Sequence, residues 1–84
     1  MDEKQYINKI IKIIKEETDR NIDVKKTLEQ NNFDSLDVIS IALGIEKNFK
    51  INIPDKDLKK FKTVKDNENY LNKKIKTKNY KILI

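Results

Sequence analysis

Hydrophobic residues recur at helical spacing near the start of the chain. Between residues 3 and 17 they fall at i, i+3, i+4 and i+7, which places them on one side of a helix: Ile7, Ile10, Ile11 and Ile14. Tyr6 and Ile13 lie beside this stripe. The pattern predicts an amphipathic helix that packs through its isoleucine face.

The next segment, residues 18–33, has no helical spacing. Its apolar residues are scattered along the chain, at Ile22, Val24, Leu28 and Phe33. We therefore expect a long loop that these four side chains pin to the core. Loops of this length in compact domains are often functional.

A second helix is predicted over residues 35–49, and its apolar residues cover a wider arc than packing on one side requires. They divide into two stripes. One stripe suits a bundle core: Val38, Ile41, Ala42, Ile45 and Phe49. The other stripe comprises Leu36, Ile39 and Leu43. Spacing alone leaves two interpretations of it open, a broader core contact or an exposed surface for a partner, since apolar patches on small domains often mark interaction sites.

A short third helix is predicted where Pro54 ends the regular structure that precedes it. Asp55 is placed to cap this helix, and Leu58 and Phe61 would point inward from it.

The last helix is predicted from Thr63 and Asp66, whose spacing resembles a capping box, and it continues to about Ile75. The tail of residues 76–84 changes character, and the sequence does not predict its structure. The elements together predict an all-α fold: a four-helix bundle with a short third helix and a long loop between the first two helices.

The composition limits the classes of function. The 84 residues are enough for one small domain, and a single Gly and a single Pro favour helices over a many-stranded sheet. The chain has no Cys and no His, which removes disulfides, thiolate and imidazole metal ligands and the usual general base. A carboxylate pair could still do acid–base work, but the composition argues against an enzyme and predicts neither catalytic residues nor a metal site.

No apolar stretch approaches the roughly 20 residues that a membrane helix needs. The N-terminal sequence MDEKQY is acidic and polar, where a signal peptide is basic and then apolar. We therefore expect a cytoplasmic protein without a membrane-inserted segment.

The net charge of +5 is unevenly distributed. Residues 1–49 carry 8 basic and 10 acidic side chains, whereas residues 50–84 carry 11 basic and 4 acidic ones. A basic region can bind nucleic acid or an anionic membrane. Lys greatly outnumbers Arg here, however, and recognition of bases and phosphates favours Arg. A solvated basic face is the simpler interpretation, and we expect no nucleic-acid partner.

The start of the second helix carries the candidate chemistry. Asp34 is the natural N-cap, which leaves Ser35 at the first helical position with no capping role. The Ser35 hydroxyl would then lie at the positive end of the helix, which favours a phosphate or another anion. For an isolated Asp-Ser pair, a small polar residue that is merely tolerated at a helix start is the alternative.

The wider context resembles the acyl carrier protein family, including the peptidyl and aminoacyl carrier domains. The motif is FDSLDVISIALGIEKNFKINIPDKDLKKFKTVKDNENYL, residues 33–71. It follows the family pattern without a gap: Asp-Ser-Leu, a helix ending in Glu-x-x-Phe, an extended Ile-Pro segment, a short third helix, and Thr-Val opening the fourth. The resemblance implies a carrier domain over residues 1–75, with only the tail of residues 76–84 outside it.

The resemblance implies that Ser35 receives 4′-phosphopantetheine from coenzyme A through a phosphopantetheinyl transferase that uses Mg²⁺. The prosthetic arm would supply the thiol that the chain lacks and carry an acyl or aminoacyl group as a thioester, while the protein itself catalyses nothing. Asp34 would assist the transferase's metal site as well as cap the helix. The positions that dock partner enzymes in the family correspond to Leu36, Asp37, Ile39, Leu43 and Glu46.

The sequence departs from the family pattern in its charges. The second helix of fatty-acid carriers is usually acidic, but here several positions are uncharged or basic: Ser40, Lys47, Asn48 and Lys50. The third-helix region is also basic, with Lys56, Lys59, Lys60 and Lys62. A partner with a basic docking patch would be repelled. Asn32 also replaces a frequent Gly, and Asn adopts positive φ less freely than Gly does.

These departures argue against the main fatty-acid synthase carrier and for a dedicated carrier in a specialised pathway of the fatty-acid-like, polyketide or nonribosomal-peptide type, or in cell-surface modification. We also expect the carrier to be a monomer. Its partners would be the transferase, an acyl- or aminoacyl-loading enzyme, and a downstream synthase or transferase. One alternative is an unmodified carrier-like module for docking or regulation. Another is a basic helical protein that binds nucleic acid or membrane through residues 56–81, which predicts strongly salt-dependent binding.

Overall fold

The computed structural model describes the backbone of residues 6–83 and the side chains of residues 6–75. Four helical segments follow one another: α1 (Ile7–Thr18), α2 (Ser35–Phe49), the 3-10 helix η1 (Asp55–Lys60) and α3 (Val64–Leu83). The described backbone contains no strand. The predicted all-α fold is confirmed, with its short third helix and its long loop between the first two helices.

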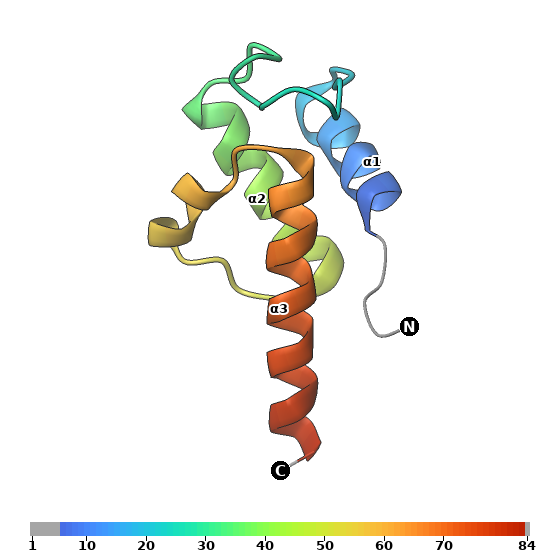
Figure 1. The fold of residues 1–84 in the computed structure, drawn as a ribbon, viewed down its shortest axis with the longest axis vertical. Helices are drawn as coiled ribbons and strands as arrows, with labels where there is room; N and C mark the ends of the chain where they lie inside the picture. The colour runs from blue at the N-terminus through green and yellow to red at the C-terminus, as the bar shows by residue number, and fades with distance from the viewer. Residues whose placement is uncertain (1–5, 84) are drawn as a thin grey trace.

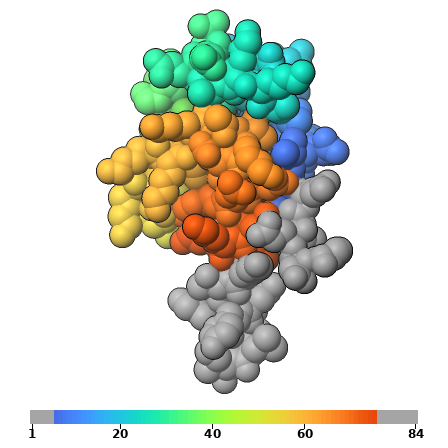
Figure 2. Space-filling model, in the orientation of Figure 1, coloured from blue at the N-terminus to red at the C-terminus, as the bar shows by residue number. Residues whose placement is uncertain are grey.

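The helices are arranged around α1 and α2, which pack against each other (Figure 1). α3 packs on α1, and η1 lies against α2. The loop of residues 19–34 covers one end of the bundle, where the first turns of α2 and α3 also lie (Figure 2). The backbone of residues 76–83 continues α3 beyond the other helices. The division into a carrier domain of residues 1–75 and a tail stays a prediction.

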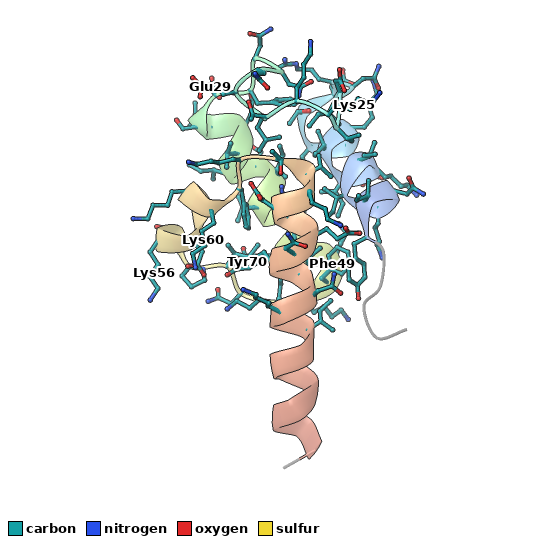
Figure 3. The ribbon with its side chains drawn as sticks, in the orientation of Figure 1. Lys25, Glu29, Phe49, Lys56, Lys60 and Tyr70 are labelled. Atoms are coloured by element: carbon teal, nitrogen blue, oxygen red, sulfur yellow. The ribbon has the colours of Figure 1, made fainter. Side chains whose placement is uncertain are left out.

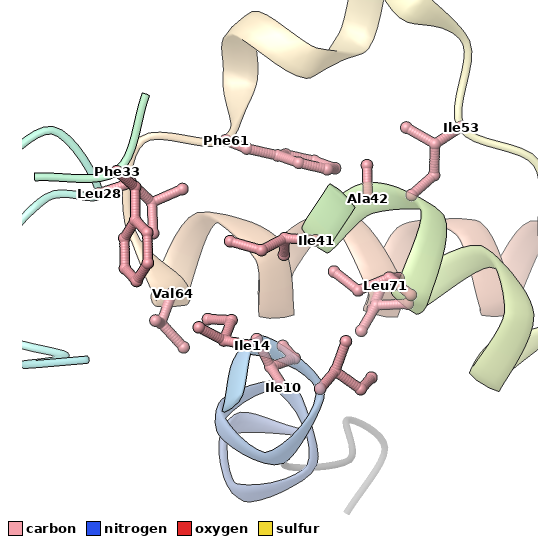
Figure 4. Close-up of a cluster of buried hydrophobic side chains, with 12 residues drawn as sticks. Ile10, Ile14, Leu28, Phe33, Ile41, Ala42, Ile53, Phe61, Val64 and Leu71 are labelled. Atoms are coloured by element: carbon pink, nitrogen blue, oxygen red, sulfur yellow. The ribbon is translucent and has the colours of Figure 1, made fainter. Parts of the chain in front are cut away.

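The core is formed by apolar side chains from α1, α2, α3 and the connecting segments, and Leu58 of η1 packs against it partly buried (Figure 4). Its members are Ile10, Ile13, Ile14, Leu28, Phe33, Ile41, Ala42, Ile45, Ile53, Phe61, Val64 and Leu71. The predicted stripe of α1 is partly wrong, because Ile13 is fully buried while Ile11 is only half-buried. The reason is that α1 contacts both α2 and α3, so its buried face is centred between Ile10 and Ile14.

Gly44 allows α1 and α2 to approach closely. A Cβ atom at this position would lie 2.7 Å from Cγ of Glu17 and 2.7 Å from Cγ2 of Ile13. Carbon atoms in contact prefer separations of about 3.5–4.0 Å. The only Gly of the chain is therefore placed where a side chain would force the two helices apart.

The loop is held by polar as well as apolar contacts. Leu28 and Phe33 are buried and Ile22 is half-buried, as predicted, but Val24 is 39% exposed because it projects from a turn. The side chain of Asn31 crosses the loop: its Oδ1 accepts a hydrogen bond from the Asp23 N–H (2.8 Å), and its Nδ2 donates to the carbonyls of Asp23 (3.0 Å) and Thr27 (2.8 Å). The loop path therefore depends on an amide that periodicity cannot reveal.

The predicted capping box of α3 is present: the Thr63 N–H donates to Asp66 Oδ2, and the Asp66 N–H donates to Thr63 Oγ1, each at 3.0 Å. The predicted cap of η1 is wrong, because no side chain caps this short helix and Asp55 is exposed. The buried acidic residue of η1 is Asp57, whose Oδ2 accepts a hydrogen bond of 2.6 Å from the Tyr70 hydroxyl. Phe61 is buried as predicted.

The pair of Asp57 and Tyr70 makes stability depend on pH. The hydrogen bond from Tyr70 lowers the pKa of Asp57 and outweighs the opposing effect of burial. A lowered pKa in the folded state stabilises the fold above the ordinary pKa, and this contribution is lost as the pH falls through the lowered value. We therefore expect acidification from about pH 7 to about pH 2 to cost wild-type protein more stability than Tyr70→Phe.

Urea unfolding at both pH values measures this difference, together with an NMR titration of the Asp57 carboxyl group. Tyr6→Phe is the control, since the Tyr6 hydroxyl enters none of the hydrogen bonds found among residues 6–75. Equal losses in wild type and Tyr70→Phe would show that this hydrogen bond does not set the pKa of Asp57.

Candidate functional site

The start of α2 is fixed by a reciprocal pair of hydrogen bonds. Asp34 Oδ1 accepts from the Asp37 N–H (2.9 Å), and Asp37 Oδ2 accepts from the Asp34 N–H (3.0 Å). The expected N-cap is therefore Asp34, and Asp37 completes a capping box that sequence reasoning had missed. The signal was available, because an acidic residue three positions after an Asp cap is the spacing of this motif.

Ser35 is the first residue of α2, and it is exposed. Its hydroxyl enters none of the hydrogen bonds found within the described part of the chain. The N–H groups of a helix's first turn have no intrahelical acceptor, and they give this end a partial positive charge. Ser35 therefore presents a free hydroxyl beside donors that favour an anionic group.

Two open clefts meet at Ser35. The first, of about 470 Å³, lies between the loop and the start of α2, with Leu28, Phe33 and Phe61 among its lining residues. The second, of about 300 Å³, lies between α2 and η1, where Ile39 and Leu58 are among the lining residues. The surroundings of the hydroxyl therefore leave room for a substituent on Ser35.

The second stripe of α2 is exposed rather than part of the core. Leu36 is 71% exposed, Leu43 is 53% exposed and Ile39 is 42% exposed, whereas the neighbouring Ile41 is fully buried. This finding excludes the broader core contact, while docking of a partner on the strip stays a prediction. The domain keeps an unpartnered apolar strip beside Ser35.

The two acidic residues expected to dock partners are engaged within the domain. Asp37 belongs to the capping box and lies 3.6 Å from a guanidinium nitrogen of Arg20. Glu46 is half-buried, and its carboxylate accepts a hydrogen bond of 2.6 Å from the Ile53 N–H, which fastens the extended segment after α2. Both carboxylates therefore have structural roles, and their role in docking stays a prediction.

The η1 region presents the predicted basic surface. Lys56, Lys59, Lys60 and Lys62 are all exposed, and Figure 3 shows Lys56 and Lys60 projecting from η1. Lys60 lies 3.4 Å from Asp57, and Lys59 borders the cleft between α2 and η1. Positive charge is therefore found on one side of the apolar strip.

Sequence reasoning missed Arg20, which contacts the residues just before Ser35. Asn32, at the position where a Gly is frequent, adopts the left-handed conformation with φ of 67°. Its carbonyl accepts a hydrogen bond from Arg20. The sequence feature that could have pointed to Arg20 is its rarity, because it is the only Arg in the chain.

The described residues provide neither a metal-binding cluster nor a membrane-spanning helix. No group of three or more acidic, His or Cys side chains is arranged to hold a metal ion within this part of the chain. Among the same residues, no helix has the length and apolar character needed to cross a membrane.

The fold and the site define a class of small helical carrier proteins with an exposed serine at the start of the second helix. The family model described as "Phosphopantetheine attachment site" matches residues 8–71. The chain belongs to the acyl carrier protein family. Proteins of this family are carriers rather than catalysts, and the family model implies covalently attached 4′-phosphopantetheine as the cofactor. The free hydroxyl and the open surroundings of Ser35 fit this group.

Known relatives agree with this assignment. The chain is 39% identical over 62 residues to an acyl carrier protein of Buchnera aphidicola, a match that covers 67% of this chain and 78% of the relative. It is 46% identical over 41 residues to an acyl carrier protein of Bdellovibrio bacteriovorus, and here the match spans only about half of each protein, 49% of this chain and 53% of the relative. The crystal structure of an acyl carrier protein from Thermotoga maritima has a TM-score of 0.75 and 30% identity, and the similarity covers 84% of this chain and 87% of that one.

Proposed function

We propose that the protein carries an acyl or aminoacyl group as a thioester on 4′-phosphopantetheine attached to Ser35. The observation that carries this proposal is the exposed hydroxyl of Ser35 at the capped start of α2, which enters no hydrogen bond found within the described part of the chain. The attached arm supplies a thiol, which the chain itself lacks. Ser35 provides the oxygen that bonds to the phosphate, and the helix terminus stabilises the negative charge of that phosphate by about 0.3–1 kcal/mol.

Loading requires a separate phosphopantetheinyl transferase and Mg²⁺. Asp34 holds the first turn of α2 in place through its contact with Asp37, and it is exposed beside Ser35. A carboxylate in this position can also contribute to the transferase's metal site, as oxygen ligands suit Mg²⁺. Asp34 therefore has two roles in this proposal, one within the domain and one toward the transferase.

Partner enzymes dock on the apolar strip of Leu36, Ile39 and Leu43. This strip lies beside Ser35, so an enzyme that covers it also faces the attached arm. Asp37 and Glu46 border the same helix face, and one oxygen of each carboxylate accepts a hydrogen bond from the backbone of the domain. The partners are an enzyme that loads the acyl or aminoacyl group and a downstream synthase or transferase.

The basic η1 surface favours partners whose docking patch carries acidic rather than basic residues, because like charges at the rim oppose association. This argues for a specialised pathway of the fatty-acid, polyketide or nonribosomal-peptide type. That the carrier works as a monomer in the cytoplasm stays a prediction.

The proposal is tested by intact-mass measurement after incubation with coenzyme A, Mg²⁺ and a broad-specificity phosphopantetheinyl transferase. We expect the mass to increase by one phosphopantetheine. A known carrier treated in parallel shows that the transferase is active. If the control gains the arm and this protein does not, the proposal is wrong, and the apolar strip would instead serve an unmodified docking or regulatory module.

A further inference from the structure

The chain contains 18 Lys and a single Arg. Arg20 lies near the start of the loop of residues 19–34, and its guanidinium contacts the end of this loop, just before Ser35. Arg20 Nη2 donates a hydrogen bond to the Asn31 carbonyl at 2.5 Å, and Arg20 Nη1 donates to the Asn32 carbonyl at 3.1 Å. Two nitrogens of one planar group thus hold two consecutive carbonyls. A Lys ammonium is a point charge without this fork geometry.

Arg20 also contacts the residues on either side of the Asp34-Ser35 pair. Its guanidinium carbon lies 4.2 Å from the centroid of the buried Phe33 ring, a cation–π distance. Its Nη1 lies 3.6 Å from Asp37 Oδ2, the oxygen that accepts from the Asp34 N–H. The contacts before the pair and those after it therefore converge on the same side chain.

The backbone held by Arg20 has an uncommon conformation. Asn32 has φ of 67°, a region that few residues other than Gly occupy. The Asn32 N–H donates to the Glu29 carbonyl (2.9 Å), and the Phe33 N–H donates to the Leu28 carbonyl (3.0 Å), so the turn before Asp34 is tight. The tight turn and the two hydrogen bonds from Arg20 together hold this left-handed residue two positions before the helix cap.

We propose that Arg20 is a positioning residue for Ser35. Its guanidinium holds the backbone of residues 31–34 in a single conformation, so that the Ser35 hydroxyl has a fixed position when the transferase binds. This inference rests on the proposed function of Ser35 as the attachment point. Arg20 then determines how well residues 31–35 are ordered in the protein before it binds the transferase.

The role predicted for Arg20 is local. Its side chain is 40% exposed, and exposed ion pairs contribute little to overall stability. Leu28 and Phe33 anchor the loop in the core without it. Loss of Arg20 should therefore loosen residues 31–35 and leave the bundle folded, which separates positioning from general stability.

The test uses Arg20→Ala and Arg20→Lys, with Lys25→Ala as the matched control. Lys25 is an exposed cation of the same loop, and it enters none of the ion pairs found among residues 6–75 (Figure 3). Loading by the transferase is followed at increasing carrier concentration to separate KM from kcat. If residues 31–35 are ordered in only a fraction of the carrier molecules, the apparent affinity for the transferase falls in proportion to that fraction.

For Arg20→Ala we expect kcat/KM to fall about 10-fold, mainly through a higher KM. The reason is that residues 31–35 of this variant must become ordered when the transferase binds. Arg20→Lys keeps the charge near Asp37 but cannot span both carbonyls, so it should remain well below wild type. Lys25→Ala should load as wild type does. Thermal unfolding followed by circular dichroism verifies that all the variants are folded.

A second measurement does not depend on loading. The ¹⁵N heteronuclear NOE of the amides of residues 31–35 should fall in both Arg20 variants and stay unchanged in Lys25→Ala. If the wild type is never loaded, the proposed function fails, while this NOE still decides whether Arg20 orders the segment. Unchanged NOE values, or loading kinetics equal to those of wild type in both Arg20 variants, would overturn the inference.

Discussion

Replacing Ser35 with Ala should abolish attachment of phosphopantetheine and leave the fold nearly unchanged. The substitution removes the oxygen to which the phosphate would bond. It does not touch the cap of α2, because the two hydrogen bonds of the box join Asp34 and Asp37. Exposed substitutions away from such contacts usually change stability by no more than about 0.5 kcal/mol. Intact mass after the transferase reaction measures loading, and circular dichroism with thermal unfolding measures the fold.

The chain offers a matched control for this experiment. Ser40 is the only other Ser, and it lies on the same helix in a half-buried position. Ser40→Ala should gain one phosphopantetheine as the wild type does. Attachment to Ser35→Ala would mean that the site lies elsewhere. A large loss of helicity in that variant would mean that Ser35, and not only Asp34, supports the start of α2.

The helices were predictable because burial imposes a helical period on the sequence. The bounds predicted for the second helix, residues 35–49, agree with α2. Periodicity also separated the buried stripe of Ile41 and Ile45 from the strip containing Leu36. It could not decide whether that strip was covered, because exposure depends on the position of η1, which is set by tertiary contacts. Tertiary contacts also explain why Ile13 was misassigned. Two helices, α2 and α3, cover α1, so its buried face is wider than the predicted stripe.

The site was predictable where its contacts are local in sequence. The cap at Asp34 involves residues three positions apart, a spacing that a motif records. The contacts of Arg20 with Asn31 and Asn32 span 11 and 12 residues and depend on the path of an irregular loop. No period or motif encodes such a path. Asn32 adopts the left-handed conformation at a position where a Gly is frequent, and its carbonyl accepts a hydrogen bond from Arg20, a contact that no local pattern predicts.

Truncating the two stripes of α2 should have opposite effects on stability and on loading. Ile41 is fully buried, and Ile41→Ala should lower the free energy of unfolding by about 2–5 kcal/mol through lost burial and a cavity. This is a large share of the roughly 5–15 kcal/mol by which small domains are stable. Leu36→Ala and Ile39→Ala remove side chains that already face solvent, so each should cost far less. Urea unfolding measures all three variants.

The same three variants should separate in the transferase reaction. Leu36→Ala and Ile39→Ala should reduce kcat/KM for loading, because an enzyme that reaches Ser35 must cover this strip, whereas Ile41→Ala should load normally under conditions where it is folded. Phe49→Ala provides an intermediate case. Phe49 is half-buried and packs edge-on against Tyr6, with the ring centroids 5.1 Å apart, so its loss should lower stability without affecting loading. Equal destabilisation by truncation of either stripe would mean that Leu36 and Ile39 are covered in solution. The strip would then contribute to packing, and partner docking would require another surface.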